Sequence, residues 1–319
     1  MYVANYVTMM KDDKNNDIVM DFETMTKRNI GGEFLTMIKG DIDNFGIILS
    51  CGLENHSVSS HSTLSSQLKY FFSIGVNKLL AGWCDDHASL GKTDRVVYCV
   101  YSGGDDIFFV TTQSYALELV RDLNEKFTEF TCSNPEIHIS YSFTNFKHNT
   151  PIRIISDFAD NNQKAIKRKY KNELPKGSKT IPPDFFLSQN DKAGSIIFDT
   201  PVKNNRLDEI IRWTELLTKW IELEDNPPLT KGAIRYFFDL SVMMTKYFDG
   251  DLRSLFWHPK LTYYIKRNIY LDCDSLTNYE NQKFEEFITE MLKIEVKTGS
   301  DIKEILTPIM SAVILRTRK

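Results

Sequence analysis

Two short acidic runs lie far apart along the chain. Residues 41–46 read Asp-Ile-Asp-Asn-Phe-Gly after an apolar run, and residues 103–106 read Gly-Gly-Asp-Asp between two β-rich runs. Carboxylates brought close together repel one another, and the hard cations Mg²⁺ and Mn²⁺ prefer such oxygen ligands. Cations of this kind can bind a triphosphate, activate an attacking hydroxyl and stabilise a leaving pyrophosphate. The runs predict a metal site for nucleotidyl transfer, with these ligands: Asp41, Asp43, Asp105 and Asp106.

Gly103 and Gly104 stand where the second run must turn. We expect them to permit positive φ in a tight turn and to let a phosphate or ribose approach the backbone. A Gly-Gly-Asp-Asp run by itself is typical of a solvated hairpin turn. Asp41 and Asp43, two residues apart and so on one face of a strand end, favour the metal site instead.

The first half of the chain alternates strand and helix patterns. Strands are predicted at 34–42, 95–101, 107–112 and 137–143, and helices at 62–83 and 115–130. This β-α-β-β-α-β order is typical of a ferredoxin-like antiparallel sheet with both helices on one face. Such a topology brings the end of the first strand beside the hairpin turn, so the two acidic runs converge.

The remaining chain changes character. A helix at 151–171, a loop at 172–190 and a strand at 195–198 complete the first part, and helical patterns alone follow. Those helices are expected at 206–224, 230–248, 253–270, 276–296 and 300–317. The fold class is therefore α+β, a ferredoxin-like domain followed by an all-α domain. The expected divisions are an N-terminal segment at 1–33, a domain with the Gly-Gly-Asp-Asp run at 34–202 and a helical domain at 203–319.

Charge and cysteine usage exclude some classes. The net charge of −4 does not indicate a nucleic-acid binder. Basic residues between 164 and 179 form a local patch, open to interpretation as a solvated face or as a contact to RNA backbone. The five cysteines include no C-x-x-C pair, which argues against a zinc ribbon and a disulfide scaffold. No apolar run is long enough to cross a bilayer, which argues against a membrane-spanning protein. We expect a cytoplasmic protein without membrane contact.

Several motifs together resemble a known family. They are the runs at 39–46 and 101–108, the Leu-Ser-Ser-Gln-Leu helix at 64–68 and the strand at 137–140. In order and spacing they resemble the catalytic second palm domain of the large subunit of type III CRISPR effector complexes, most closely the type III-A (Csm) form. The helical region after residue 206 resembles that subunit's C-terminal domain.

The resemblance implies a nucleotide cyclase-like palm that converts ATP into cyclic oligoadenylate once the guide-bound complex captures target RNA. It implies Asp41, Asp105 and Asp106 as catalytic metal ligands for Mg²⁺ or Mn²⁺, with Asp43 beside them. It also implies that the backbone of Asn44, Phe45 and Gly46 binds the triphosphate. Further residues implied at the ATP site are Ser65 and Ser66 near the adenine, Gly103 and Gly104 in the turn, and Lys192 on phosphate oxygens.

The chain also departs from the family pattern. About 33 residues precede the catalytic strand, where family members carry an HD nuclease and a first palm. We therefore expect a split or truncated form without DNA cleavage of its own. Its expected partners are other type III subunits, guide and target RNA, and a separate chain with the first palm. Homodimerisation, as in GGDEF diguanylate cyclases, is the other way to complete the site.

Two other functions remain open from the residues. A non-catalytic scaffold would dock guide RNA and neighbouring subunits, although the intact carboxylates count against it. A diguanylate cyclase-like enzyme shares the palm, but Asp106-Ile107 and the helical domain oppose that interpretation.

Overall fold

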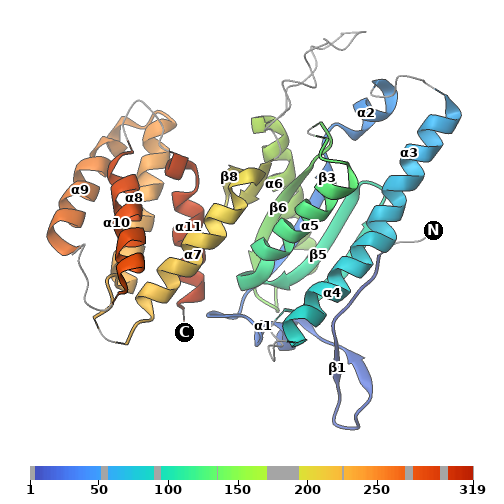
Figure 1. Cartoon of the computed structure of the whole chain (residues 1–319), viewed down its shortest axis with the longest axis horizontal. Helices are drawn as coiled ribbons and strands as arrows, with labels where there is room; N and C mark the ends of the chain where they lie inside the picture. The colour runs from blue at the N-terminus through green and yellow to red at the C-terminus, as the bar shows by residue number, and fades with distance from the viewer. Residues whose placement is uncertain are drawn as a thin grey trace. The chain divides into compact units, whose positions relative to one another are not determined.

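The computed structural model describes residues 4–51, 57–89, 95–134, 136–170, 194–224, 226–269, 276–294 and 301–318. The chain divides into two compact units, Met1–Leu207 and Asp208–Lys319 (Figure 1). The division thus falls after Leu207, whereas the sequence predicted a boundary after residue 202. Lys192 and the expected loop at 172–190 lie outside the described residues.

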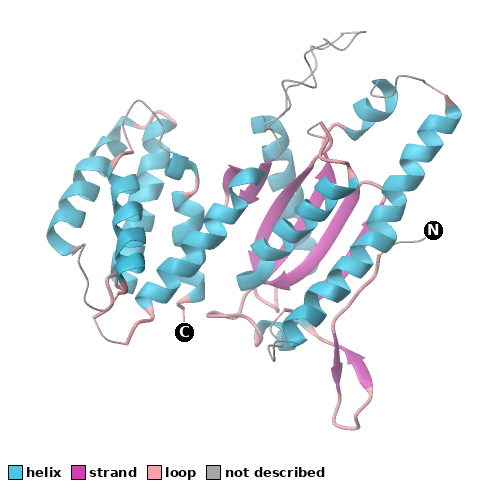
Figure 2. Cartoon of the chain, in the orientation of Figure 1, coloured by secondary structure: helices cyan, strands magenta, loops and turns pink. Residues whose placement is uncertain are grey.

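A six-stranded sheet forms the centre of the first unit (Figure 2), with the strand order β4-β5-β3-β6-β7-β8. Its strands are β3 (Leu35–Ile42), β4 (Val97–Gly103), β5 (Asp106–Thr112), β6 (Ile139–Phe146), β7 (Gly194–Ile197) and β8 (Thr200–Lys203). The central strand β3 pairs antiparallel with both β5 and β6. The order β4-β5-β3-β6 is that of a ferredoxin-like sheet, so the predicted fold class is confirmed.

One face of this sheet carries α1 (Phe22–Thr26) and α6 (Ile152–Tyr170). Leu35 and Met37 of β3 pack there in an apolar core with Ile155 and Ala159 of α6. Because side chains alternate along a strand, the next two residues on this face are Lys39 and Asp41. The face therefore changes from apolar core to charged rim within one strand.

The opposite face is covered by a π-helical segment (Phe71–Gly75), α4 (Val76–Ser89) and α5 (Ala116–Phe130), and α3 (Val58–Tyr70) leads into the π-helical segment. Figure 1 shows α4 and α5 in front of the sheet. Phe72 and Phe127 are buried here, with their ring centroids 5.9 Å apart. The predicted helices at 62–83 and 115–130 therefore exist. The first begins earlier, because Ser57 Oγ accepts a hydrogen bond from Ser60 N and caps it.

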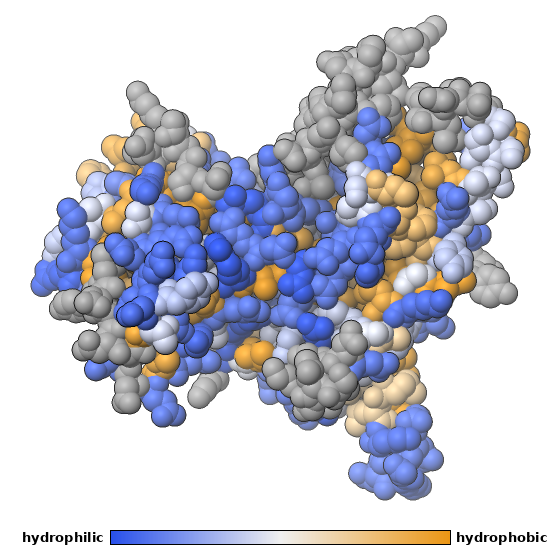
Figure 3. Space-filling model, viewed as in Figure 1, coloured by the Kyte–Doolittle hydropathy of each residue, from blue (hydrophilic) through white to orange (hydrophobic). Residues whose placement is uncertain are grey.

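The N-terminal segment adds elements that periodicity did not predict. Ala4 and Val7 form bridges to Ser102 and Tyr98, so this segment lines the outer edge of β4. It continues into a hairpin of β1 (Met9–Lys11) and β2 (Asp17–Val19), whose end is hydrophilic in Figure 3. Two other short elements, α2 (Phe45–Cys51) and β8, were also not predicted. Elements of three to seven residues are too short for a periodic spacing of apolar residues to be recognised.

The second unit is helical, as predicted. Its helices are α7 (Leu207–Ile221), α8 (Lys231–Phe248), α9 (Trp257–Asn268), α10 (Asn278–Leu292) and α11 (Leu306–Arg316). Trp213, Trp220 and Trp257 are almost wholly buried in its core. Thr277 and Glu280 form a capping box that starts α10. Among the helices described in either unit, none combines the length and the apolar character needed to cross a membrane.

Candidate active site

Asp41 and Asp106 are directly opposite each other at the ends of paired strands. Asp41 stands near the end of β3, Asp106 begins β5, and the antiparallel register pairs them. Directly opposed residues on a sheet have their Cβ atoms about 4.5–5.5 Å apart. Asp105 occupies the hairpin turn, and its carbonyl oxygen accepts a hydrogen bond from Ile42 N at 3.2 Å. The structure thus brings together these three of the predicted ligands.

The carboxyl group of Asp106 is perturbed by this arrangement. Its pKa is raised from 3.8 to about 6, first by desolvation and then by the charges of Asp41 and Asp105. Lys39 acts in the opposite direction and lowers the pKa of Asp106. Crowded carboxylates of this kind favour a proton or a cation between them. The pair is therefore suited to bind a positively charged ligand.

The hairpin turn has one left-handed residue. Gly104 has φ +73°, and a Cβ at this position would meet nothing within 4 Å. Gly103 is a strand residue paired with Asp106, and its φ is not positive. The expectation of a positive φ at Gly103 was therefore wrong. A positive φ at the first turn residue alone is that of a type II′ hairpin, which suits the twist of the flanking strands. Tyr101 helps to hold the turn, because its hydroxyl donates to the Gly103 carbonyl at 2.7 Å.

Asp43 lies in the interior, apart from the more accessible Asp41, Asp105 and Asp106. Only 1% of the residue is exposed, and its Oδ2 accepts a hydrogen bond from Ser140 Oγ. His138 Nε2 stands 3.2 Å from the same oxygen, and Asp43 N donates to the His138 carbonyl at 2.9 Å. Asp43 therefore attaches the turn after β3 to the beginning of β6. No spacing rule in the sequence links residue 43 to residues 138 and 140.

Gly40 is a site-supporting residue that the sequence analysis did not identify. It precedes Asp41 in β3, and a Cβ built on it would stand 2.7 Å from Ile107 Cγ1 and 3.0 Å from Tyr141 Cδ1. Contacts under 3.0 Å force a neighbour to move. Glycine therefore allows the strands on both sides to close around the residue before Asp41.

The expected phosphate-binding backbone forms a sharp turn into α2. Asn44 is left-handed with φ +55°, and its carbonyl accepts from Ile47 N at 2.8 Å. Phe45 and Gly46 are the first residues of α2. Lys192, the expected phosphate ligand, is outside the described part of the chain. The backbone at 44–46 is thus placed directly after the strand that carries Asp41.

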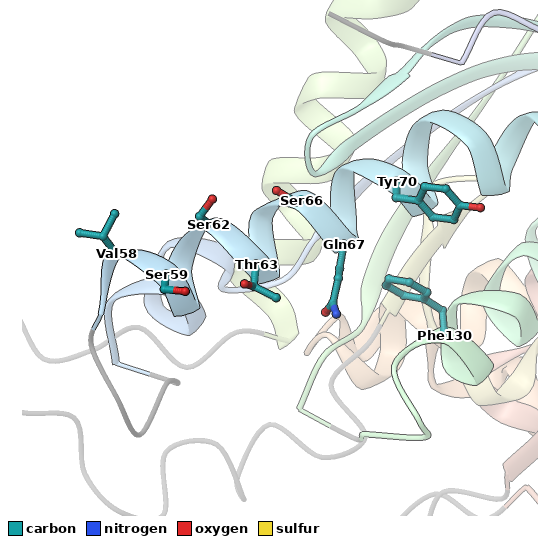
Figure 4. Close-up of a pocket in the computed structure, with 8 residues that line it drawn as sticks. All are labelled: Val58, Ser59, Ser62, Thr63, Ser66, Gln67, Tyr70 and Phe130. Atoms are coloured by element: carbon teal, nitrogen blue, oxygen red, sulfur yellow. The ribbon is translucent and has the colours of Figure 1, made fainter.

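Ser65 and Ser66 are exposed on α3. Ser66 contributes to a groove of about 730 Å³ that follows this helix (Figure 4), whereas Ser65 is not among its lining residues. Side chains rich in hydroxyl groups line the groove, and Tyr70 and Phe130 lie at one end of the labelled set in Figure 4. The full lining set is Val58, Ser59, Ser62, Thr63, Ser66, Gln67, Tyr70 and Phe130.

Fewer carboxylates are placed to bind a cation than the sequence predicted. Within the described ranges, no group of three or more His, Cys, Asp or Glu is arranged to hold a metal ion. Mg²⁺, however, commonly takes one or two carboxylates and completes its shell with water and substrate phosphates. The opposed Asp41 and Asp106, with the raised pKa of the latter, fit that ligand set. The expected four-carboxylate cluster is reduced to this pair with Asp105 beside it.

The fold and these carboxylates define a palm domain of the nucleotide cyclase and polymerase type. Residues 34–175 match the model of one family, described as Cas10/Cmr2, second palm domain. This part of the chain is therefore similar to the second palm domain of Cas10/Cmr2 proteins.

Curated relatives extend the similarity beyond the palm. A Cas10/Csm1 protein of subtype III-A from Methanocaldococcus jannaschii, described as a CRISPR system single-strand-specific deoxyribonuclease, is 32% identical over 129 residues, which are 38% of this chain and 16% of that protein. The corresponding protein of Mycobacterium tuberculosis is 26% identical over 234 residues, 70% of this chain and 24% of that protein. The chain thus spans less than a quarter of these relatives' length.

Solved structures support the same fold. Csm1 of T. onnurineus matches all of this chain with a TM-score of 0.67 at 18% identity, and the match covers 42% of Csm1. A Csm1–Csm4 cassette in complex with cA4 matches 98% of this chain and 40% of that chain, with a TM-score of 0.59 at 18% identity. Both units of the chain therefore have counterparts in the Csm1 fold.

Proposed function

We propose that this chain supplies the catalytic palm that converts ATP to cyclic oligoadenylate in a target-RNA-activated type III CRISPR complex. The observation that carries the proposal is the direct opposition of Asp41 and Asp106, with Asp105 in the adjoining turn, on a domain similar to the second palm domain of Cas10/Cmr2 proteins. Two strands with fixed register hold Asp41 and Asp106, so the spacing of these two carboxylates does not depend on a flexible loop.

ATP is the substrate favoured by the structural relatives. Csm1–Csm4 cassettes have been solved with one ATP, with pppApA and with cA4. These ligands are a substrate, a linear product of joining two adenosine nucleotides, and a cyclic product. The corresponding reaction for this chain is attack of a ribose 3′-hydroxyl on the α-phosphorus of the next ATP, with loss of pyrophosphate. Ring closure repeats the same exchange within one chain of nucleotides.

Each part of the site then has a task. Asp41 and Asp106 would hold Mg²⁺ or Mn²⁺, which when bound neutralises phosphate charge and acidifies the attacking hydroxyl. The open space at Gly104 leaves room for substrate beside the turn. The backbone of Asn44, Phe45 and Gly46 would face the triphosphate, and Ser65 and Ser66 the adenine. Asp43 would position that backbone through Ser140 and His138, and Lys192 remains a proposed phosphate ligand.

The same relatives suggest the partners. Csm1 has been solved as a subcomplex with Csm4 of the type III-A interference complex. We therefore expect a Csm4-like subunit, guide RNA and target RNA to join this chain, together with a first palm domain that completes the nucleotide site.

Replacement of the turn carboxylates tests the activity. The D105A/D106A chain, assembled with its partner subunits, guide RNA and target RNA, should lose at least about a thousandfold of its oligoadenylate synthesis. Mass spectrometry of reactions with ATP and Mg²⁺ measures the products. D208A/E209A, which removes two acidic residues from the helical unit, is the matched control and should leave synthesis unchanged.

Other products identify other functions. Unchanged synthesis by D105A/D106A would contradict the proposed site. A cyclic dinucleotide made from GTP would indicate a diguanylate cyclase-like enzyme. A complete complex that binds target RNA and makes no oligoadenylate in the unmodified form would leave only the scaffold function.

A further inference from the structure

Lys39 occupies an unusual place in the central strand. Leu35 and Met37 precede it on the same face of β3 and are fully buried, and Asp41 follows it on that face. The strand is paired on both sides at this residue, with Phe108 in β5 and Ser142 in β6. Lysine loses hydration when it is enclosed in this way, so an apolar residue would serve packing better. A lysine at this position therefore indicates that the ammonium group has a function other than packing.

The ammonium of Lys39 is held at the rim of the acidic site. Its Nζ forms an ion pair with Asp160 of α6, and the two side chains are 23% and 43% exposed. Among the residues that the structure describes, Lys39 is the cation whose charge acts on Asp106. An ion pair with a solvent-exposed partner contributes little stability, because water screens it and the side chains lose freedom. Lys39 can therefore leave Asp160 at small cost.

A triphosphate brings several anionic oxygens to Asp41 and Asp106. An ammonium group offers three donors and a compact charge, which suits phosphate oxygens at variable angles. Residues two apart on a strand lie about 7 Å apart and share a face. We propose that Lys39 is a substrate-binding residue that exchanges Asp160 for a phosphate group of the nucleotide when the site is occupied. This inference rests on the proposed function and deepens it.

Opposite effects of two substitutions separate this role from a structural ion pair. Titration calorimetry of the chain assembled with its partner subunits, in the presence of Mg²⁺ and AMPPNP, measures binding without turnover. K39M should raise the Kd for AMPPNP by about tenfold or more, since it removes a charged donor to phosphate. D160N should lower the Kd by about twofold to fivefold, since Lys39 no longer has a competing carboxylate. K39R keeps the charge and should recover part of the affinity lost in K39M.

The alternative outcomes are distinct. If the pair only joins β3 to α6, K39M and D160N remove the same contact and should change the Kd in the same direction. That result, or an unchanged Kd in K39M with a melting temperature close to that of the unmodified chain, overturns the role of Lys39. Failure of the unmodified assembled complex to bind AMPPNP at all would instead remove the proposed nucleotide site itself.

Discussion

The carboxyl group of Asp106 illustrates how this site is built at the scale of single residues. Desolvation and the neighbouring Asp41 and Asp105 raise its pKa to about 6, so the charge that would bind a cation is unfavourable in the free protein. A ligand with positive charge relieves that repulsion, which links binding to stability. The charged form of Asp106 is therefore more favourable when a cation is bound beside it.

This repulsion predicts a pH-dependent stability. The pKa of Asp106 is higher in the folded chain than its ordinary value of 3.8, so the unfolded chain ionises first as the pH rises. The folded state loses stability between about pH 4 and pH 6, and the full penalty remains above that range. D106N lacks the penalty. In buffer with a chelator, D106N should melt about 1–3 °C above the unmodified chain at pH 7.5, and the difference should vanish near pH 4.

Melting curves followed by circular dichroism at several pH values provide the measurement. A D106N chain that is less stable at pH 7.5, or offset equally at every pH, would show that Asp106 is not the strained group.

At the scale of elements, three neighbouring strands position the carboxylates. β3 contributes Asp41, β5 contributes Asp106, and β6 supports the turn after β3 through Ser140. Backbone ladders fix the register of all three strands, and register determines which side chains are opposed. Substitutions that alter the packing between these strands should therefore alter the positions of the carboxylates.

Gly40 allows the closest of these approaches. In G40A the new methyl group meets Ile107 and Tyr141, which are themselves fully buried. We expect the free energy of unfolding to fall by about 1–3 kcal/mol, as for other overpacked interiors. Gly82 of α4 is the matched control, because a Cβ there meets nothing within 4 Å. G82A should be neutral or stabilising by up to about 1 kcal/mol in urea titrations. Equal effects of the two substitutions would rule out crowding at Gly40.

The buried hydrogen bond between Asp43 and Ser140 should stabilise the fold. S140A removes a hydroxyl donor from a buried carboxylate and should lower the free energy of unfolding by about 1–3 kcal/mol. The combined D43N/S140A loss should be smaller than the sum of the single losses, because both changes remove one contact. S62A, on the exposed surface of α3, should stay within about 0.5 kcal/mol of the unmodified chain.

Metal titration of activity distinguishes this positioning role from ligation. In the assembled complex, D43N and S140A should keep the Mg²⁺ concentration for half-maximal synthesis, while D41N should raise it. A similar increase in D43N and D41N would make Asp43 a metal ligand.

At the scale of the whole molecule, each of the two units has a core of its own. The palm unit is organised around its sheet, and the helical unit around Trp213, Trp220 and Phe284. Three of the four tryptophans of the chain belong to the helical unit. Independent cores of this kind are typical of separate domains.

The helical unit should therefore fold alone. A fragment of residues 208–319 should show helical circular dichroism, the blue-shifted emission of buried tryptophan, and one cooperative transition in urea. Removal of a tryptophan contact by F284A should lower its stability by about 3–5 kcal/mol, since Phe284 is fully buried with its ring centroid 5.3 Å from that of Trp220. A fragment with exposed tryptophan and no transition would show that this unit depends on the palm.

Periodicity and motifs along the sequence predicted the main strands and helices, the helical second part and the convergence of Asp41 with Asp105 and Asp106, but not the short elements at the N-terminus, α2 or β8. These features follow from local periodicity and from the few ways in which a β-α-β-β-α-β chain can form a sheet. The placement of Asp43, the tight packing at Gly40 and the ion pair of Lys39 are visible only in the folded chain. These depend on partners about 100 residues or more away in the chain, or on space between strands. Side-chain spacing along one segment carries no information about such neighbours, because burial is set only when distant segments pack together.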